Sequence, residues 1–117
     1  MDWNNKQQVL EQIIKDGTNL FFASEKLKND KEVVLEAIYQ SSGIALKYAS
    51  EELKNDKEIV LEAVKENSVI LKDATLYQDD EEVVLIAVKN NGLSLKYASD
   101  RLKNNESIVL GNFFFNS

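Results

Sequence analysis

The sequence predicts an all-α fold, in which stacked helix-turn-helix repeats form a small α-solenoid-like array. One pattern recurs at intervals of about 25 residues, and such a period is typical of repeat architectures. Leucines mark one position of this pattern, namely Leu10, Leu35, Leu61, Leu85 and Leu110, with spacings of 25, 26, 24 and 25 residues. Apolar residues within each copy follow a helical period, and the chain contains no proline. A single copy cannot bury its own apolar face, so neighbouring copies are expected to cover one another.

The whole chain, residues 1–117, is predicted to form one helical-repeat domain. Its units are residues 5–29, 30–55, 56–79 and 80–104, followed by a terminal half-unit at 105–117. A chain of this length can bury roughly two thirds of its unfolded surface. We therefore expect it to fold without a metal ion or a disulfide.

The first half of each unit is predicted to be an α-helix. Asp30 can cap the free amides of the first turn, and Glu32 then lies near the positive end of the helix dipole. The apolar residues of this helix spread over about 200° of its circumference. They are Val33, Val34, Leu35, Ala37 and Ile38. A helix with so wide an apolar surface is expected to lie between two neighbouring helices.

The second half of each unit is also predicted to be helical. Leu46, Ala49 and Leu53 are spaced at i, i+3 and i+7, which suits a helix packed on one side. Ser50 has two alternative roles. It lies either inside this helix or at the cap of a separate short turn through Lys54, and the sequence leaves both open.

Glycines and one irregular copy mark the breaks in the pattern. Gly43 and Gly92 follow the first helices and are predicted to end them in the left-handed cap conformation. In the third copy, Ser68 replaces this glycine, Asp73 replaces a tyrosine, and one residue is missing near Thr75. A local irregularity is therefore expected in that copy.

The repeat reads Asp-x-Glu-Val-Val-Leu-x-Ala-Val-x-x-Asn-Gly-x-x-Leu-x-Tyr-Ala-Ser-x-x-Leu-Lys-Asn. It is carried best by residues 80–104, and by residues 30–55 with one inserted residue before Gly43. Over almost the whole chain this pattern resembles the repeat family known as domain of unknown function 4116. The resemblance implies an array of short helical repeats. It implies no activity, cofactor or binding residue.

The composition removes several classes of chemistry. There is no cysteine and no histidine, so thiolate sites, the usual general base and the commonest metal ligand are missing. The acidic residues recur with the repeat and lack the apolar surroundings that raise a carboxyl pKa toward neutrality. We therefore predict no catalytic residue, no cofactor and no metal site, and we expect that the protein is not an enzyme.

Charge and hydropathy bear on the partners and the compartment. A net charge of -6 argues against direct binding to nucleic acid, because that affinity comes largely from lysine and arginine. No apolar run approaches the roughly 18 residues of a membrane span, so no membrane contact is predicted. The polar start of the chain lacks the features of a secretory signal. We expect a cytoplasmic location.

Candidate partner contacts are residues that the repeat does not dictate. Ile14 and Tyr39 hold a place that is lysine in later copies, and Ile86 holds a place that is glutamate in earlier copies. Such residues on a charged ridge are either harmless or contact points. Three phenylalanines near the end pose a similar question: Phe113, Phe114 and Phe115. Three alternatives are open: they cap the last apolar face of the stack, dock on another subunit, or begin the rest of a longer parent protein that was truncated.

The function favoured by the sequence is non-enzymatic interaction with another protein, through a ridge or a terminal face of the stack. An alternative is a small acidic inhibitor that occupies the basic nucleic-acid groove of a nuclease or host-defence protein. A carboxylate-based hydrolase is a third, which would show as a deep pocket with a raised acid pKa. The identity of the partner and the oligomeric state stay open.

Overall fold

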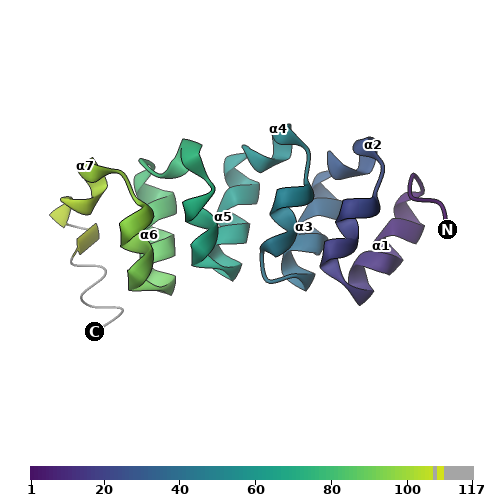
Figure 1. The fold of residues 1–117 in the computed structure, drawn as a ribbon, viewed down its shortest axis with the longest axis horizontal. Coiled ribbons are helices and arrows are strands. Elements are labelled where there is room, and N and C mark those ends of the chain that lie inside the picture. The colour runs from purple at the N-terminus through teal and green to yellow at the C-terminus, as the bar shows by residue number, and fades with distance from the viewer. Residues whose placement is uncertain (107, 110–117) are drawn as a thin grey trace.

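The computed structural model describes residues 1–106, 108 and 109 of the chain. Every regular element in that part is a helix, and it contains no strand. The helices follow one another in a row, with the N-terminus at one end (Figure 1). The molecule is elongated, with extents of 51 × 24 × 16 Å. These features confirm the predicted all-α array of stacked repeats.

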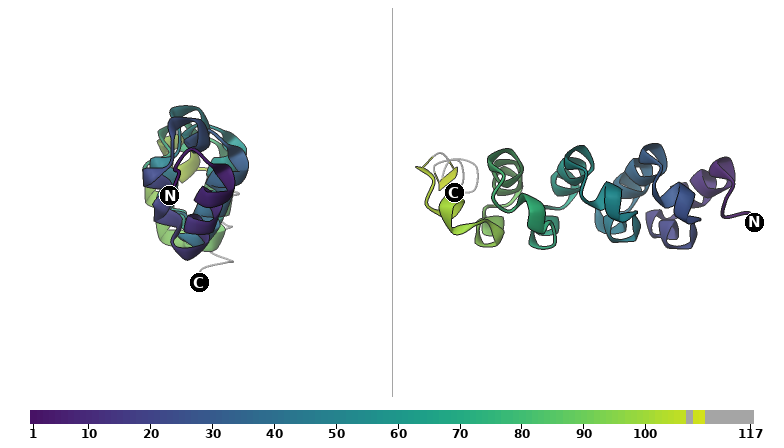
Figure 2. Two further views of the ribbon diagram at one scale, coloured as in Figure 1. Left: turned by 90° about the vertical axis from the view of Figure 1, so that its right-hand side faces the viewer. Right: turned by 90° about the horizontal axis from the view of Figure 1, so that it is seen from above.

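Four α-helices of 10 residues each begin the repeats, and we number repeats 1 to 4 by them. They are α1 (Lys6–Lys15), α3 (Lys31–Gln40), α5 (Lys57–Glu66) and α6 (Glu81–Asn90). Each is followed by a 3₁₀-helix: η1 (Gly17–Phe22), η2 (Ile44–Tyr48), η3 (Ser68–Lys72) and η5 (Gly92–Tyr97). Viewed along the long axis, the repeats overlie one another in a single outline (Figure 2).

A short third element closes each repeat. In repeats 1, 2 and 4 it is one turn of α-helix: α2 (Glu25–Lys28), α4 (Glu51–Lys54) and α7 (Asp100–Lys103). In repeat 3 it is a 3₁₀-helix, η4 (Thr75–Tyr77). The irregularity expected in the third copy is therefore confirmed.

Three of the four first helices begin at aspartate caps, as predicted, whereas α1 begins at Asn5. The Asp30 carboxylate accepts a hydrogen bond from the amide of Val33 at 3.1 Å, and Asp80 accepts the equivalent bond from Val83 at 3.1 Å. Asp56 accepts from the amide of Glu58 at 2.9 Å. Each cap satisfies an amide that the first turn of a helix leaves without an intrahelical partner.

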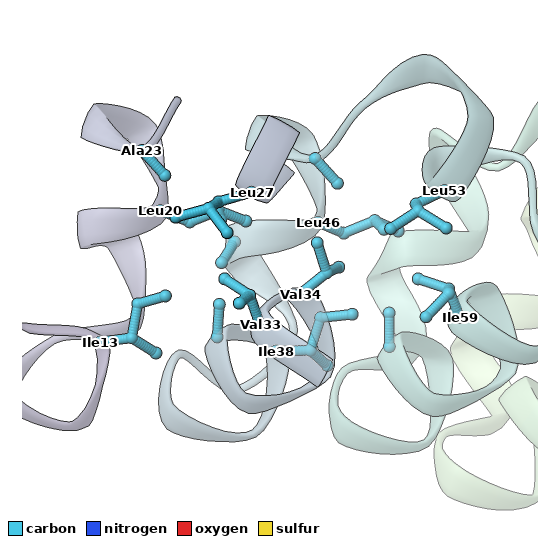
Figure 3. Close-up of a cluster of buried hydrophobic side chains, with 14 of the residues drawn as sticks. Ile13, Leu20, Ala23, Leu27, Val33, Val34, Ile38, Leu46, Leu53 and Ile59 are labelled. Atoms are coloured by element: carbon cyan, nitrogen blue, oxygen red, sulfur yellow. The ribbon is translucent and has the colours of Figure 1, made fainter. Parts of the chain in front are cut away.

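The first helix of repeat 3 is covered on two sides, as was predicted for these helices. In α5, Ile59 and Ala63 belong to an apolar cluster with repeats 1 and 2. Val60 and Val64 belong to a second cluster with repeats 3 and 4. All four side chains are fully buried. Figure 3 shows the first cluster, with Ile38 of α3 filling the space toward α5.

The second half of each unit is not one continuous helix. Ala49 has extended backbone, and the Ser50 hydroxyl accepts a hydrogen bond from the amide of Leu53 at 3.2 Å, so Ser50 caps a separate turn. The reason lies between repeats: the Ser50 amide donates to the Lys28 carbonyl of repeat 1 at 2.9 Å. An amide used in this way cannot continue a helix. Of the two alternatives for Ser50, the structure therefore shows the cap.

The two glycines predicted as helix stops behave differently. Gly43 has a φ of 89°, and its amide donates to the Ile38 carbonyl at 2.8 Å, as a left-handed cap does. For Gly92 the prediction was wrong. There α6 ends at the extended residue Asn91, whose side chain accepts a hydrogen bond from the amide of Leu93 at 3.0 Å and starts η5. The residue inserted before Gly43 accounts for the difference, because it lengthens the connection in repeat 2 alone.

The outer side of α1 carries polar side chains at two positions that are apolar in α3. In α3, Val33 and Ala37 face repeat 1 and are fully buried. The corresponding residues of α1 are Gln8 and Gln12, and both are half-buried. A polar outer surface of this kind is typical of a repeat that ends a stack.

Candidate interaction surfaces

A ladder of ion pairs joins the starts of the first helices. In each rung, the first lysine of one helix reaches the cap aspartate and the next glutamate of the following repeat, at N–O distances between 3.0 and 3.6 Å. The rungs are Lys6 with Asp30 and Glu32, Lys31 with Asp56 and Glu58, and Lys57 with Asp80 and Glu82. Much of the acidic charge on this edge is therefore compensated by the protein itself.

The ladder shifts the pKa of its members in opposite directions. The hydrogen bond to Asp30 is the main cause of a raised pKa at Lys6. At Asp30, burial acts to raise the pKa, but the Lys6 ammonium and the Val33 amide together outweigh burial, so the pKa of Asp30 is lowered. The pKa of Asp56 and that of Asp80 are lowered in the same way, by Lys31 and Lys57 respectively. These aspartates are held in their charged form.

A second surface follows the 3₁₀-helices, in which side chains three residues apart project from the same side. Three of these helices pair an exposed apolar residue with an exposed lysine three positions later. The pairs are Ile44 with Lys47, Val69 with Lys72, and Leu93 with Lys96. In η1, Phe21 stands at the position that holds lysine in the other three helices. We call these seven residues the 3₁₀ face.

The apolar members of the 3₁₀ face are unusually open to solvent for residues of their type. Leu93 is 76% exposed, Phe21 is 55% exposed, and Ile44 and Val69 are each 46% exposed. Single exposed apolar residues are normal on a protein surface, but here they recur once per repeat along one side. The recurrence makes this side of the stack a candidate contact surface.

The lysines of the 3₁₀ face differ from those of the ladder. Among the acids that the structure describes, none forms an ion pair with Lys47, Lys72 or Lys96. The ammonium group of Lys47 lies 5.1 Å from the ring centroid of Tyr48, and that of Lys96 lies 5.2 Å from the ring of Tyr97. Their positive charge is therefore available to an acidic partner.

Aromatic rings extend this surface at the N-terminal end of the stack. Ring centroids lie 5.3 Å apart for Trp3 and Phe22, 5.2 Å apart for Phe22 and Phe21, and 5.3 Å apart for Phe21 and Tyr48. The Lys28 ammonium lies 5.7 Å from the Phe21 ring. Phe22, like Phe21, is 55% exposed. Repeats 1 and 2 thus share a chain of contacting rings beside the 3₁₀ face.

An open pocket of about 230 Å³ lies between repeats 2 and 3. We call it the seam pocket, and its lining residues are Leu46, Glu51, Lys54, Asn55, Ile70, Asp73, Ala74 and Thr75. In the described part of the chain, no three acidic side chains come together where they could hold a metal ion. Nor does that part include a helix with the length and hydropathy of a membrane span.

The comparison with protein families agrees with the repeated architecture. The family model described as "Domain of unknown function (DUF4116)" matches residues 5–42, 38–77 and 80–111. The chain belongs to the DUF4116 family. The resemblance drawn from the repeat pattern is therefore confirmed. No curated protein and no solved structure matches the chain significantly.

The contact residues predicted for this DUF4116 chain lie in different settings. Ile14 is 60% exposed, and Tyr39 is 45% exposed, with its hydroxyl donating to Glu62 at 3.1 Å. They occupy corresponding places on the adjacent helices α1 and α3. Ile86 is half-buried and packs against the second apolar cluster. All three stay predictions. The other three candidates, Phe113, Phe114 and Phe115, lie outside the described residues.

Sequence reasoning on this DUF4116 chain missed the 3₁₀ face. The sequence shows that Lys47, Lys72 and Lys96 recur, but a face that mixes lysines with acids was interpreted as a solvated surface. The apolar residues three positions earlier fall at a variable place of the repeat and were not considered. The available signal was the recurrence of an apolar residue three positions before a lysine. That spacing places two side chains directly above each other only in a 3₁₀-helix.

Proposed function

We propose that this DUF4116 chain is a non-enzymatic protein-interaction module that binds its partner on the 3₁₀ face. One observation carries the proposal: Ile44, Val69 and Leu93 are exposed beside lysines without ion pairs, in a protein whose net charge is -6. The matching partner presents a segment that combines apolar and acidic side chains. Charge complementarity of this kind selects partners and speeds their association.

The structure gives less support to the alternative of an acidic inhibitor. Glu32, Glu58 and Glu82 would be natural contacts for a basic groove, but each already lies within 3.6 Å of a lysine ammonium in the ladder. A basic partner would have to compete with these lysines. We therefore place the contact on the 3₁₀ face, where the uncompensated charge is positive.

A hydrolase based on carboxylates also receives little support. The pKa of Asp30, Asp56 and Asp80 is lowered by the ladder, whereas a general acid needs a pKa raised toward the working pH. The cytoplasmic location stays a prediction from the sequence.

The test compares two charge-reversal variants of equal size. One carries K47E, K72E and K96E on the 3₁₀ face. The matched control carries K15E, K26E and K103E, which reverse three exposed lysines that make no ion pair with a described acid. Proteins retained by the tagged wild type from cell lysate are identified, purified and titrated against each variant.

We expect a partner that loses affinity for the first variant and keeps it for the control. The affinity should also fall when salt is raised from about 50 to 300 mM, because exposed charges are screened over a shorter distance. Equal binding by both variants would refute the 3₁₀ face as the contact surface. A third variant, I14D with Y39D, tests the ridge predicted from the sequence in the same assay.

A further inference from the structure

Repeat 3 lacks the tyrosine that ends the 3₁₀-helices of repeats 2 and 4. In repeat 2 this ring is Tyr48, whose centroid lies 5.3 Å from that of Phe21 in repeat 1. In repeat 4 it is Tyr97, which packs against the second apolar cluster. Repeat 3 has Asp73 at this position. While η1 packs against η2 and η3 against η5, η2 and η3 do not pack together to the same extent.

The boundary between repeats 2 and 3 also lacks two hydrogen bonds that join other repeats. The amides of Ser50 and Ser99 donate to the carbonyls of Lys28 and Gln78, each at 2.8–2.9 Å. The hydroxyl of Ser50 also donates to the Asn29 side chain at 2.6 Å. Neither bond forms between the corresponding described residues, Thr75 of repeat 3 and Lys54 or Asn55 of repeat 2. The backbone before Thr75 also differs, because Ala74 has a ψ of 65° where Ala49 and Ala98 have ψ values of 165° and 163°.

The seam pocket lies at this same boundary, and Asp73 and Thr75 are among its lining residues. Leu46, Ile70 and Ala74 supply apolar atoms to its lining, and Asp73 contributes at the position of the missing ring. Its volume is about 230 Å³. An engineered apolar cavity of roughly 150 Å³ accommodates benzene, so the seam pocket has room for a single aromatic ring. Pockets for drug-sized ligands are larger, about 300–1,000 Å³.

The charges around the seam pocket are unbalanced. Lys54 pairs with Glu51 at 3.2 Å. Asp73, by contrast, makes no ion pair and no side-chain hydrogen bond with any described residue. A ligand that carries a positive charge beside its ring would therefore find a partner at Asp73.

We propose that the seam pocket receives an aromatic side chain of a partner protein, from a segment in which a tyrosine adjoins an arginine. The ring enters the pocket beside Leu46, Ile70 and Ala74, and the guanidinium group pairs with Asp73. The inference rests on the proposed function in that the occupant belongs to a protein partner. The site itself is separate from the 3₁₀ face, as its lining shares no residue with it.

Synthetic peptides test the proposal on the purified full chain. The probe is acetyl-Gly-Arg-Tyr-Gly-amide, its control is the same peptide with alanine in place of tyrosine, and binding is followed by amide chemical shifts in NMR titrations. We expect the tyrosine peptide to shift the amides of Leu46, Ile70 and Ala74, and the alanine peptide to leave them unchanged. Tyramine, an aromatic amine without a peptide backbone, serves as a third probe.

Two variants of Asp73 separate the ring from the charge. Asp73→Tyr introduces the residue of repeats 2 and 4, and we expect it to fill the pocket and abolish these shifts. Asp73→Asn keeps the space and removes the charge, and we expect it to weaken binding about two- to fivefold, as the loss of an exposed ion pair does. Asp100→Asn, which removes an exposed carboxylate from α7, is the matched control and should bind like the wild type.

Three outcomes would overturn the proposal. These are the absence of seam shifts with the tyrosine peptide at millimolar concentration, unchanged binding to folded Asp73→Tyr, and shifts with tyramine but not with the peptide. Circular dichroism shows whether each variant is folded, and Asp73→Asn remains informative if Asp73→Tyr is not. The peptide assay needs no natural partner, so its failure leaves the test of the 3₁₀ face unaffected.

Discussion

Asp80 accepts contacts from two repeats at once, because the Lys57 ammonium lies 3.0 Å from one of its oxygens and the Val83 amide lies 3.1 Å from the other. One carboxylate therefore caps its own helix and pairs with the helix before it. Asp30 and Asp56 repeat this arrangement. Helix capping and repeat stacking are coupled through these three residues.

Asparagine at the three caps separates the two roles. The variant D30N, D56N and D80N keeps the cap, for which asparagine is as good as aspartate, and removes the charge. The pKa of each aspartate is lowered in the folded state, so its contribution to stability is present above the unfolded value of about 3.9 and is lost as the pH falls through the folded value. We expect the variant to lose less stability than the wild type between about pH 5 and 2, measured by urea unfolding.

The loss of stability at alkaline pH provides an independent check on the same variant. The pKa of Lys57 is raised mainly by its hydrogen bonds to Glu82 and Asp80. Its stabilising contribution is thus present below the unfolded value of about 10.4 and is lost as the pH rises through the folded value. The asparagine variant should show a smaller loss on this side as well. If the unfolding free energy of the variant and of the wild type changed with pH in parallel, the coupling between helix capping and repeat stacking would be contradicted.

A second prediction concerns the close approach of Gly17 to α3. A Cβ atom at Gly17 would lie 2.4 Å from the Ala37 carbonyl oxygen and 2.9 Å from the Ser41 backbone nitrogen. Because both are backbone atoms, the two repeats would have to move apart. We expect Gly17→Ala to lower the unfolding free energy by about 1–3 kcal/mol, a range found for overpacked interiors, in urea titrations.

Repeat 3 offers the control for this substitution. Ser68 occupies the position of Gly17 and is buried, so that repeat already accommodates a Cβ atom there. Ser68→Ala should therefore change stability much less than Gly17→Ala. If the two substitutions cost the same, the close contact with Ala37 is not what requires glycine.

Regular helix signals in the sequence predicted the first half of each repeat correctly. In α3, α5 and α6 the aspartate cap and the four buried positions are local features, and they appear in the structure where the pattern places them. The second half was harder because Leu46 and Ala49, three residues apart, suit an α-helix and a 3₁₀-helix equally. The deciding interaction is the bond from the Ser50 amide to the Lys28 carbonyl, which joins residues of different repeats. No window of local sequence contains it.

The seam pocket and the 3₁₀ face could not be predicted from local sequence for the same reason. The sequence revealed that Asp73 and the missing residue disturb repeat 3, but the seam pocket exists because of how repeats 2 and 3 then meet. The 3₁₀ face depends likewise on the helix type of the second half. Ile14 and Tyr39, which the sequence singled out on a first helix, are indeed exposed, since the face of that helix could be predicted.

A third prediction concerns Tyr77, which replaces the leucine of the other third elements. Its hydroxyl donates to the Asn55 carbonyl of repeat 2, across the boundary that lacks the usual serine bonds. Tyr77→Phe should cost about 0.5–1.5 kcal/mol of unfolding free energy, the typical net contribution of one hydrogen bond. Tyr39→Phe removes an exposed hydroxyl bond to Glu62 and is the control, expected to have a smaller effect in the same thermal or urea assay.

The last prediction concerns the polar N-terminal end. Gln8 and Gln12 hold the places of Val33 and Ala37, and the Gln8 side chain accepts a hydrogen bond from the Asp2 amide at 2.8 Å. The variant Q8V and Q12A gives α1 the apolar outer surface of α3, where Val33 and Ala37 are buried against repeat 1. We expect the variant to self-associate through this end, because an exposed apolar patch of that kind favours association.

Sedimentation velocity over a range of concentrations measures the effect. Gln7 and Glu11 lie on the exposed side of the same helix, so Q7V with E11A introduces apolar atoms away from the stacking face and is the matched control. The average mass of Q8V with Q12A should rise with concentration, while that of the control follows the wild type. If both variants sediment like the wild type, then the glutamines are not what keeps this end of the stack from pairing.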